Sequence, residues 1–137
     1  MTSTRRIVHT TADLEACWRH LIEPLGFSSR QIFALLFDRD GEMFPHIVHI
    51  TECPRRPDAE MVGSLADALR HARDEADPEG SCALLWARPS GGGNRATDVE
   101  WARAFATALA EHGLARWPLH IADDTVMRVV APDDLAA

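Results

Sequence analysis

The chain has 137 residues and a mass of 15.2 kDa, the usual size of a single domain with one hydrophobic core. Hydrophobic residues make up 46% and charged residues 26%, which excludes a disordered or fibrous chain, and no apolar run approaches the roughly 20 residues that a membrane span requires. A formal net charge of -7 argues against duplex nucleic acid as the main partner, because binding the phosphate backbone requires a positive face.

The N-terminus and the cysteines predict a cytoplasmic protein. Residues 1–6 have neither the apolar core nor the small-residue cleavage site of a signal peptide. The cysteines Cys17, Cys53 and Cys82 are odd in number and widely spaced, so they indicate neither a disulfide framework nor a zinc ribbon. We expect all three to be reduced thiols in or near the core.

The first half of the chain predicts a helix, a β-hairpin and a second helix. Apolar residues recur at helical spacing over residues 11–21. The apolar run 31–37 and the β-rich run that ends at Ile50 flank a turn and predict the hairpin. Because proline lacks a backbone donor, Pro45 places the second strand at an edge or a bulge. Asp58 is the expected N-cap of the next helix.

The second half predicts a buried strand that leads through a glycine-rich loop into a helix. The continuous apolar run 81–87 is typical of a strand that is buried on both faces, at the centre of a sheet. Residues 97–100 have the Thr-x-x-Glu form of a capping box and predict the start of a helix that continues to Gly113. Runs typical of strands at 116–121 and 125–130 complete the fold.

The predicted order of elements is α-β-β-α-β-α-β-β. We therefore expect an α/β (α+β) fold, with one mixed sheet of about five strands flanked by three helices. It forms a single domain over residues 1–137, with a core at about 11–131 and a short polar tail at 132–137. A second copy could pair with strand edges around Pro45 or after Val130, so a homodimer is an open alternative.

The loop after the buried strand is a candidate anion site. Its glycines Gly91, Gly92 and Gly93 could present backbone N–H groups beside a helix N-terminus, with Arg88 and Arg95 close in sequence. The loop lacks the lysine and the terminal Ser or Thr of a phosphate-binding Walker loop, and a plain surface loop explains the same residues. Both interpretations stay open.

The histidines predict no metal site. On an extended strand, residues three apart point to opposite faces, so His46, His49 and Cys53 are poorly placed to chelate one ion together. His120 could act as a general base with Ser90 as a nucleophile, but neither lies in a nucleophile elbow. A buried structural histidine is the alternative for His120.

Residues 83–91 read Ala-Leu-Leu-Trp-Ala-Arg-Pro-Ser-Gly, and Asp98 follows on the next predicted helix. With the order of elements, this stretch resembles the RadC-like branch of the JAB/MPN (JAMM) metallopeptidase fold. In that family an apolar strand runs into His-x-His-Pro-Ser-Gly, and Ser-x-x-Asp opens the next helix. The two His and the Asp bind zinc there, and a Glu at the start of an earlier strand serves the zinc-bound water. Only Pro89-Ser90-Gly91 matches that motif letter for letter.

The resemblance implies that the zinc ligands have been replaced. Trp86 and Arg88 stand where the two His belong, and Arg30 stands about where the Glu belongs. Arg95 takes the place of the Ser, so only Asp98 is retained, after a loop shorter than that of the family. Indole and guanidinium groups offer no usable lone pair to a metal, so we expect no zinc and no other cofactor. We expect the guanidinium groups of Arg30 and Arg88 to balance the charge of Asp98 instead.

The combined interpretation is a non-catalytic JAB/RadC-like domain that binds a partner protein or a small anionic ligand in the former active-site groove. The ligand-binding residues expected in that groove are Arg30, Trp86, Arg88, Ser90 and Asp98. A first alternative is a small hydrolase-like enzyme without zinc that uses His120, Ser90 and nearby arginines. A second is an accessory protein of DNA metabolism, against which the net charge of -7 and the absence of a basic stripe argue.

Overall fold

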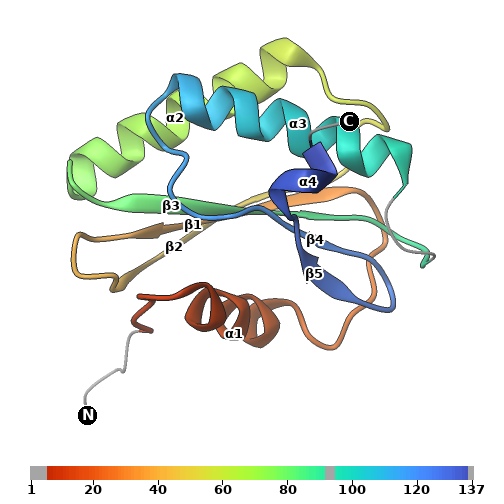
Figure 1. The fold of residues 1–137 in the computed structure, drawn as a ribbon, viewed down its shortest axis with the longest axis horizontal. Helices are drawn as coiled ribbons and strands as arrows, with labels where there is room; N and C mark the ends of the chain where they lie inside the picture. Colours follow the sequence, from red (N-terminus) through yellow and green to blue (C-terminus); the bar gives the residue numbers. More distant parts are fainter. Residues whose placement is uncertain (1–5, 92–94, 136–137) are drawn as a thin grey trace.

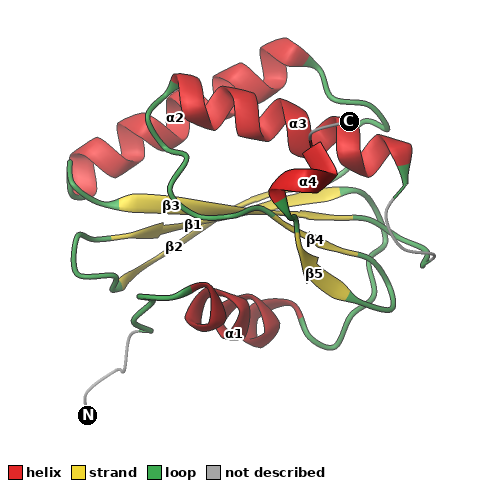
Figure 2. Ribbon diagram, in the orientation of Figure 1, coloured by secondary structure: helices red, strands yellow, loops and turns green. Residues whose placement is uncertain are grey.

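A five-stranded mixed sheet lies between two helical layers in the computed structural model, which describes residues 6–91 and 95–135 (Figure 1). Helices α2 and α3 cover one face of the sheet and α1 covers the other (Figure 2). This confirms the expected class, strand count and order of elements; the single helical turn α4 was not expected. The elements are α1 Thr11–Ile22, β1 Gln31–Phe37, β2 Met43–Ile50, α2 Ala59–Ala76, β3 Ser81–Ala87, α3 Ala96–Glu111, β4 His120–Ala122, β5 Met127–Val129 and α4 Pro132–Leu135.

The strand order is β2-β1-β3-β4-β5. All seven residues of β3 are buried, which confirms that this strand is central, and β2 is an edge strand, as Pro45 predicts. Strand β1 is antiparallel to both β2 and β3, whereas β3 and β4 are parallel and are connected through α3. The carboxyl ends of β3 and β4 therefore lie beside the amino end of β1, at the same end of the sheet.

Side-chain caps fix where the first two helices begin. The Thr10 hydroxyl accepts from the Asp13 N–H, and the Asp13 carboxylate accepts from the Thr10 N–H in return, which is a capping box at the start of α1. The Asp58 carboxylate accepts from the N–H groups of Glu60 and Met61, which confirms Asp58 as the N-cap of α2.

The expected capping box over residues 97–100 is wrong by two residues. Helix α3 begins at Ala96, so Arg95 is its N-cap and Asp98 is the third helical residue. The Asp98 carboxylate accepts a hydrogen bond of 2.9 Å from the Arg95 N–H. An acidic side chain in the first turn satisfies a backbone donor and complements the helix dipole, which explains the earlier start.

Alternate residues of β3 belong to two separate cores. Cys82, Leu84 and Trp86 pack beneath α2 and α3, whereas Ala83 and Leu85 pack against α1. All three cysteines are free and buried, as expected, and burial raises the pKa of the Cys82 thiol to about 12. No helix within residues 6–91 and 95–135 combines the length and the apolar character needed to cross a membrane.

Candidate functional site

A pocket of about 220 Å³ opens beside the carboxyl end of the central strand β3, and four of its lining residues are arginines. Backbone pairing brings these arginines together. The register of β1 with β3 sets Gln31 opposite Ala87, so Arg30 and Arg88 are neighbours. The Cys53 N–H donates to the Arg30 carbonyl at 2.9 Å, which holds the loop that carries Arg55 beside them. The lining residues are Arg30, Arg55, Trp86, Arg88, Pro89, Ser90, Arg95, Ala96 and Thr97.

Behind this pocket, Arg88 and Asp98 form a buried ion pair, as expected. The Arg88 Nε lies 2.9 Å from each carboxylate oxygen of Asp98, and the two residues are only 3% and 0% exposed. Trp86 Nε1 donates to Asp98 Oδ1 at 3.1 Å, and the Arg95 N–H donates to Oδ2 at 2.9 Å. Charge-assisted hydrogen bonds of this kind compensate the desolvation of a carboxylate. Asp98 is thus surrounded by hydrogen-bond donors.

The expectation that Arg30 also balances Asp98 is wrong. Arg30 makes neither a hydrogen bond nor an ion pair with Asp98, although both residues are described. The reason is that donors from Trp86, Arg88 and Arg95 already occupy both carboxylate oxygens. The Arg30 side chain lines the pocket instead.

The far end of the Arg88 guanidinium anchors the loop that follows β3. Its Nη1 donates to the carbonyls of Pro89 at 3.2 Å and Ser90 at 3.1 Å, and its Nη2 lies 3.9 Å from Asp123 Oδ2. Burial acts to raise the pKa of Asp123, but the N–H and hydroxyl of Thr125 and the N–H of Val126 hold it below its ordinary value. Because carboxylates and carbonyls surround Arg88, its role is to build the pocket wall.

The other three guanidinium groups leave their charge in the pocket. Among the described residues, none of Arg30, Arg55 and Arg95 forms an ion pair with a carboxylate. Arg95 Nη2 donates to the Gly91 carbonyl at 3.0 Å, which positions the side chain without neutralising it. This concentration of positive charge occurs in a chain whose formal net charge is -7. The arrangement therefore favours a negatively charged occupant.

A turn after β4 holds the rim of the pocket. Ser90 has a positive φ of 70°, and its N–H donates to Asp124 Oδ2 at 2.6 Å. Asp124 Oδ1 accepts from the Phe27 N–H at 2.9 Å, so one carboxylate ties together two loops. A Cβ at Gly91 would lie 3.1 Å from the Thr125 side chain, so a larger residue here would require that side chain to shift.

The expected anion loop is described only in part. Gly91 is present, and its carbonyl oxygen accepts from Arg95, so this glycine directs an acceptor rather than a donor toward the arginines. Gly92 and Gly93 lie outside the described residues. The first turn of α3 lines the pocket instead, through Ala96 and Thr97.

Sequence reasoning missed Arg55, Ala96 and Thr97. Arg55 and Arg56 are adjacent in the same proline-bounded loop, yet only Arg55 lines the pocket. The hydrogen bond from the Cys53 N–H to the Arg30 carbonyl holds this loop beside β1, and no local pattern predicts a contact between residues so far apart in sequence.

The residues of the enzyme alternative are not brought together. His120 is 1% exposed and pairs with Leu85, so it lies on the face of the sheet that α1 covers. Trp86 and the arginine pocket belong to the opposite face, and His120 does not line that pocket. Ser90 is exposed and lines the pocket, which His120 does not.

His120 affects stability. Burial lowers the pKa of His120, while Glu15 of α1 and a backbone hydrogen bond with Pro118 act in the opposite direction. Below pH 6.5 the unfolded chain binds a proton that folded His120 does not yet bind. We therefore expect stability to fall as the pH drops from 7 to 5, by about 1.4 kcal/mol for each unit by which the pKa is lowered.

Urea unfolding of the wild type and of His120→Leu at pH 7 and pH 5 measures this effect. His120→Leu is expected to lose less stability on acidification than the wild type, because it lacks the buried imidazole. The carboxylates that titrate in this range are the same in both proteins, so their effect cancels in the comparison. His71→Leu, at a side chain that is 72% exposed on α2, serves as the control and should follow the wild type. Equal pH dependence in all three proteins would contradict the assignment.

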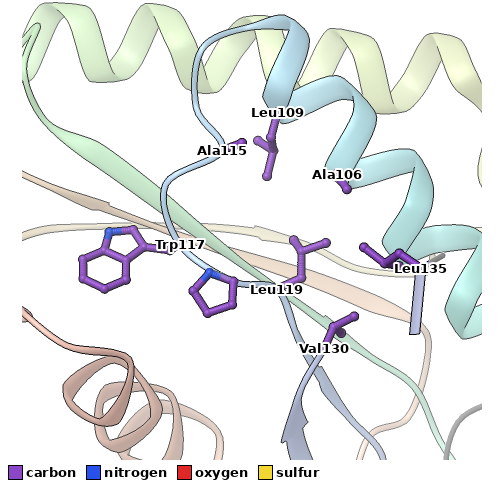
Figure 3. A pocket seen from close by; sticks show the side chains of 8 residues that line it. Ala106, Leu109, Ala115, Trp117, Leu119, Val130 and Leu135 are labelled. Carbon is purple, nitrogen blue, oxygen red and sulfur yellow. The ribbon is translucent and has the colours of Figure 1, made fainter. Parts of the chain in front are cut away.

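A second cavity of about 220 Å³ lies beside the C-terminal half of α3 (Figure 3). Leu109, Leu119, Val130 and Leu135 converge on it from α3, α4 and the segments next to β4 and β5. None of its lining residues carries a charged side chain, so it provides no group that could recognise an anion. The arginine pocket, with four guanidinium groups in its lining, is the candidate functional site.

Comparison of the chain with protein-family models, with curated proteins and with solved structures finds no match.

Proposed function

We propose that this chain is a non-catalytic domain that binds a small anion in the arginine pocket. The observation that carries the proposal is the presence of three guanidinium groups, those of Arg30, Arg55 and Arg95, which line one pocket without a carboxylate partner among the described residues. Guanidinium is the preferred group for binding carboxylate and phosphate oxygens, because its planar fork donates two parallel hydrogen bonds.

The buried pair behind the pocket supports a binding role over a catalytic one. Arg88 and Asp98 are fully engaged with each other and with the loop, and neither offers a free base or nucleophile. Among the described residues, the pocket lining contains no histidine or cysteine. A rigid wall of this kind holds a ligand in place but supplies no group for general acid–base chemistry near neutral pH.

We also propose descent from the RadC-like JAB/MPN fold, with guanidinium charge in place of the metal. The order of elements, the turn Pro89-Ser90-Gly91 and the position of Asp98 at the start of α3 support this proposal. Trp86 and Arg88, at the places of the two zinc ligands, now donate hydrogen bonds to Asp98. The free thiols favour a reducing compartment such as the cytoplasm.

Calorimetric titration of the protein with sulfate, phosphate and malonate at pH 7.5 tests the binding role. Arg30→Ala and Arg55→Ala are each expected to weaken binding about tenfold or more, because a hydrogen bond to a charged group is worth about 1.5–3 kcal/mol. Arg56→Ala is the matched control and should bind like the wild type, since Arg56 is 77% exposed and faces Glu100 at 3.8 Å.

Two results would overturn the proposed function. One is that none of the three anions produces a binding isotherm with the wild-type protein. The other is that Arg30→Ala and Arg55→Ala bind as tightly as Arg56→Ala, which would place the anion elsewhere on the surface.

A further inference from the structure

We propose that the ligand of the arginine pocket is a small phosphate monoester, bound as its dianion. This inference rests on the proposed anion site and names its ligand class. Three features of the pocket select that class: the number of uncompensated charges, the backbone donors at the start of α3, and the size and chemistry of the walls.

The charge of the pocket exceeds what a single carboxylate can neutralise. Arg30, Arg55 and Arg95 carry three positive charges, while the charge of Arg88 is balanced by Asp98 and Asp123 behind the wall. A monoanion would leave two guanidinium groups uncompensated. A phosphoryl dianion carries more charge on three oxygens, and each oxygen can accept from a different donor.

The first turn of α3 adds donors that suit a tetrahedral anion. The first hydrogen bond within this helix runs from the Val99 N–H to the Arg95 carbonyl, so the N–H groups of Ala96 and Thr97 precede the helical ladder. Both residues line the pocket, at the start of a helix of 16 residues. The Arg95 N–H is already used by Asp98, so the donors left for a ligand are those of Ala96 and Thr97.

The walls of the pocket favour a short phosphate monoester over a nucleotide. Trp86 is the aromatic residue of the lining, but it is 2% exposed and stacks on Trp101 with ring centroids 4.3 Å apart. It therefore offers no face on which a base can stack. A volume of about 220 Å³ has room for roughly seven water-sized groups, enough for a phosphoryl group and a short polar chain. The hydroxyls of Ser90 and Thr97 line the same pocket and suit such a chain.

The protonation of the ligand provides the test. A phosphate monoester has a second pKa of about 6, so it is mostly a dianion at pH 7.5 and mostly a monoanion at pH 5, whereas sulfate is a dianion at both. The titratable groups that line the pocket are all arginines, which stay charged over this range, and the carboxylates behind it are those of Asp98 and Asp123.

The experiment is calorimetric titration of the wild-type protein with glycerol 3-phosphate, sulfate, malonate and AMP at pH 7.5 and pH 5. Glycerol 3-phosphate is expected to bind best at pH 7.5 and to lose about tenfold in affinity at pH 5. Sulfate should change less than threefold between the two pH values, which controls for any change in the protein itself.

The other outcomes distinguish failure of the phosphate assignment from failure of the anion site itself. Malonate binding as tightly as glycerol 3-phosphate, or equal pH dependence for sulfate and glycerol 3-phosphate, would refute the phosphate dianion but leave the anion site in place. Tighter binding of AMP would refute the preference for a short phosphate monoester over a nucleotide. Failure of every anion to bind would remove the proposed function as well.

Discussion

Replacement of Arg88 by alanine is expected to lower the free energy of unfolding by about 3–5 kcal/mol, because it leaves the buried Asp98 carboxylate without its counter-charge. Asp98→Ala should cost a similar amount, since it removes the carboxylate that lies 2.9 Å from the Nε of the buried Arg88 guanidinium. Urea unfolding of the two single variants and of the double variant measures the coupling between the side chains.

The double variant should be less destabilised than the sum of the single variants, by about 2 kcal/mol or more, because the second substitution removes a charge that the first left unpaired. The matched surface pair is Arg56 and Glu100, which are 77% and 41% exposed, and its coupling should stay below about 1 kcal/mol. A cycle with Arg30→Ala and Asp98→Ala should give no coupling, since these side chains do not touch. Coupling near zero for Arg88 and Asp98 would mean that water screens the pair.

The fold was predictable where one residue type dictated one local structure. The unbroken apolar run of β3 requires burial on both faces, and Pro45 excludes a central position for β2, so sheet centre and edge both followed from the sequence. The start of α3 was not predictable in this way, because Thr97 and Asp98 can each satisfy a backbone donor. The buried contacts of Asp98 with Trp86 and Arg88 favour the arrangement that uses Asp98.

In the candidate site, too, contacts between residues near in sequence were predictable and contacts between distant residues were not. Arg88 directly follows β3 and Asp98 lies in the first turn of α3, so a short connection joins them and the sequence spacing alone can predict their contact. Arg30 and Arg55 reach the pocket through the pairing of β1 with β3 and the hydrogen bond from Cys53. Those contacts join residues far apart in the sequence, so no local pattern predicts that Arg30 and Arg55 line the same pocket.

Trp101 connects the core to the pocket, and its replacement is expected to affect both. The ring is fully buried and stacks on Trp86, and its Nε1 donates to the backbone carbonyl of Arg55 at 3.0 Å. Trp101→Ala should lower the free energy of unfolding by about 3–5 kcal/mol, because it leaves a large cavity between α3 and the sheet. The anion affinity of this variant should also fall, since the loop that carries Arg55 loses the hydrogen bond from the Trp101 indole.

Trp101→Phe separates the two effects, because phenylalanine retains an aromatic ring for packing but has no N–H to donate. We expect this variant to lose about 1–3 kcal/mol of stability and to bind sulfate several-fold more weakly than the wild type, with most of the loss of binding due to the freed Arg55 loop. Phe105→Leu is the control: its ring centroid lies 5.5 Å from that of Trp101, so the substitution disturbs the same core without touching that loop. It should lower the free energy of unfolding and leave anion affinity unchanged. If Trp101→Phe binds sulfate as well as Phe105→Leu does, the indole N–H does not position Arg55, and the expected effect of Trp101 on the pocket is refuted.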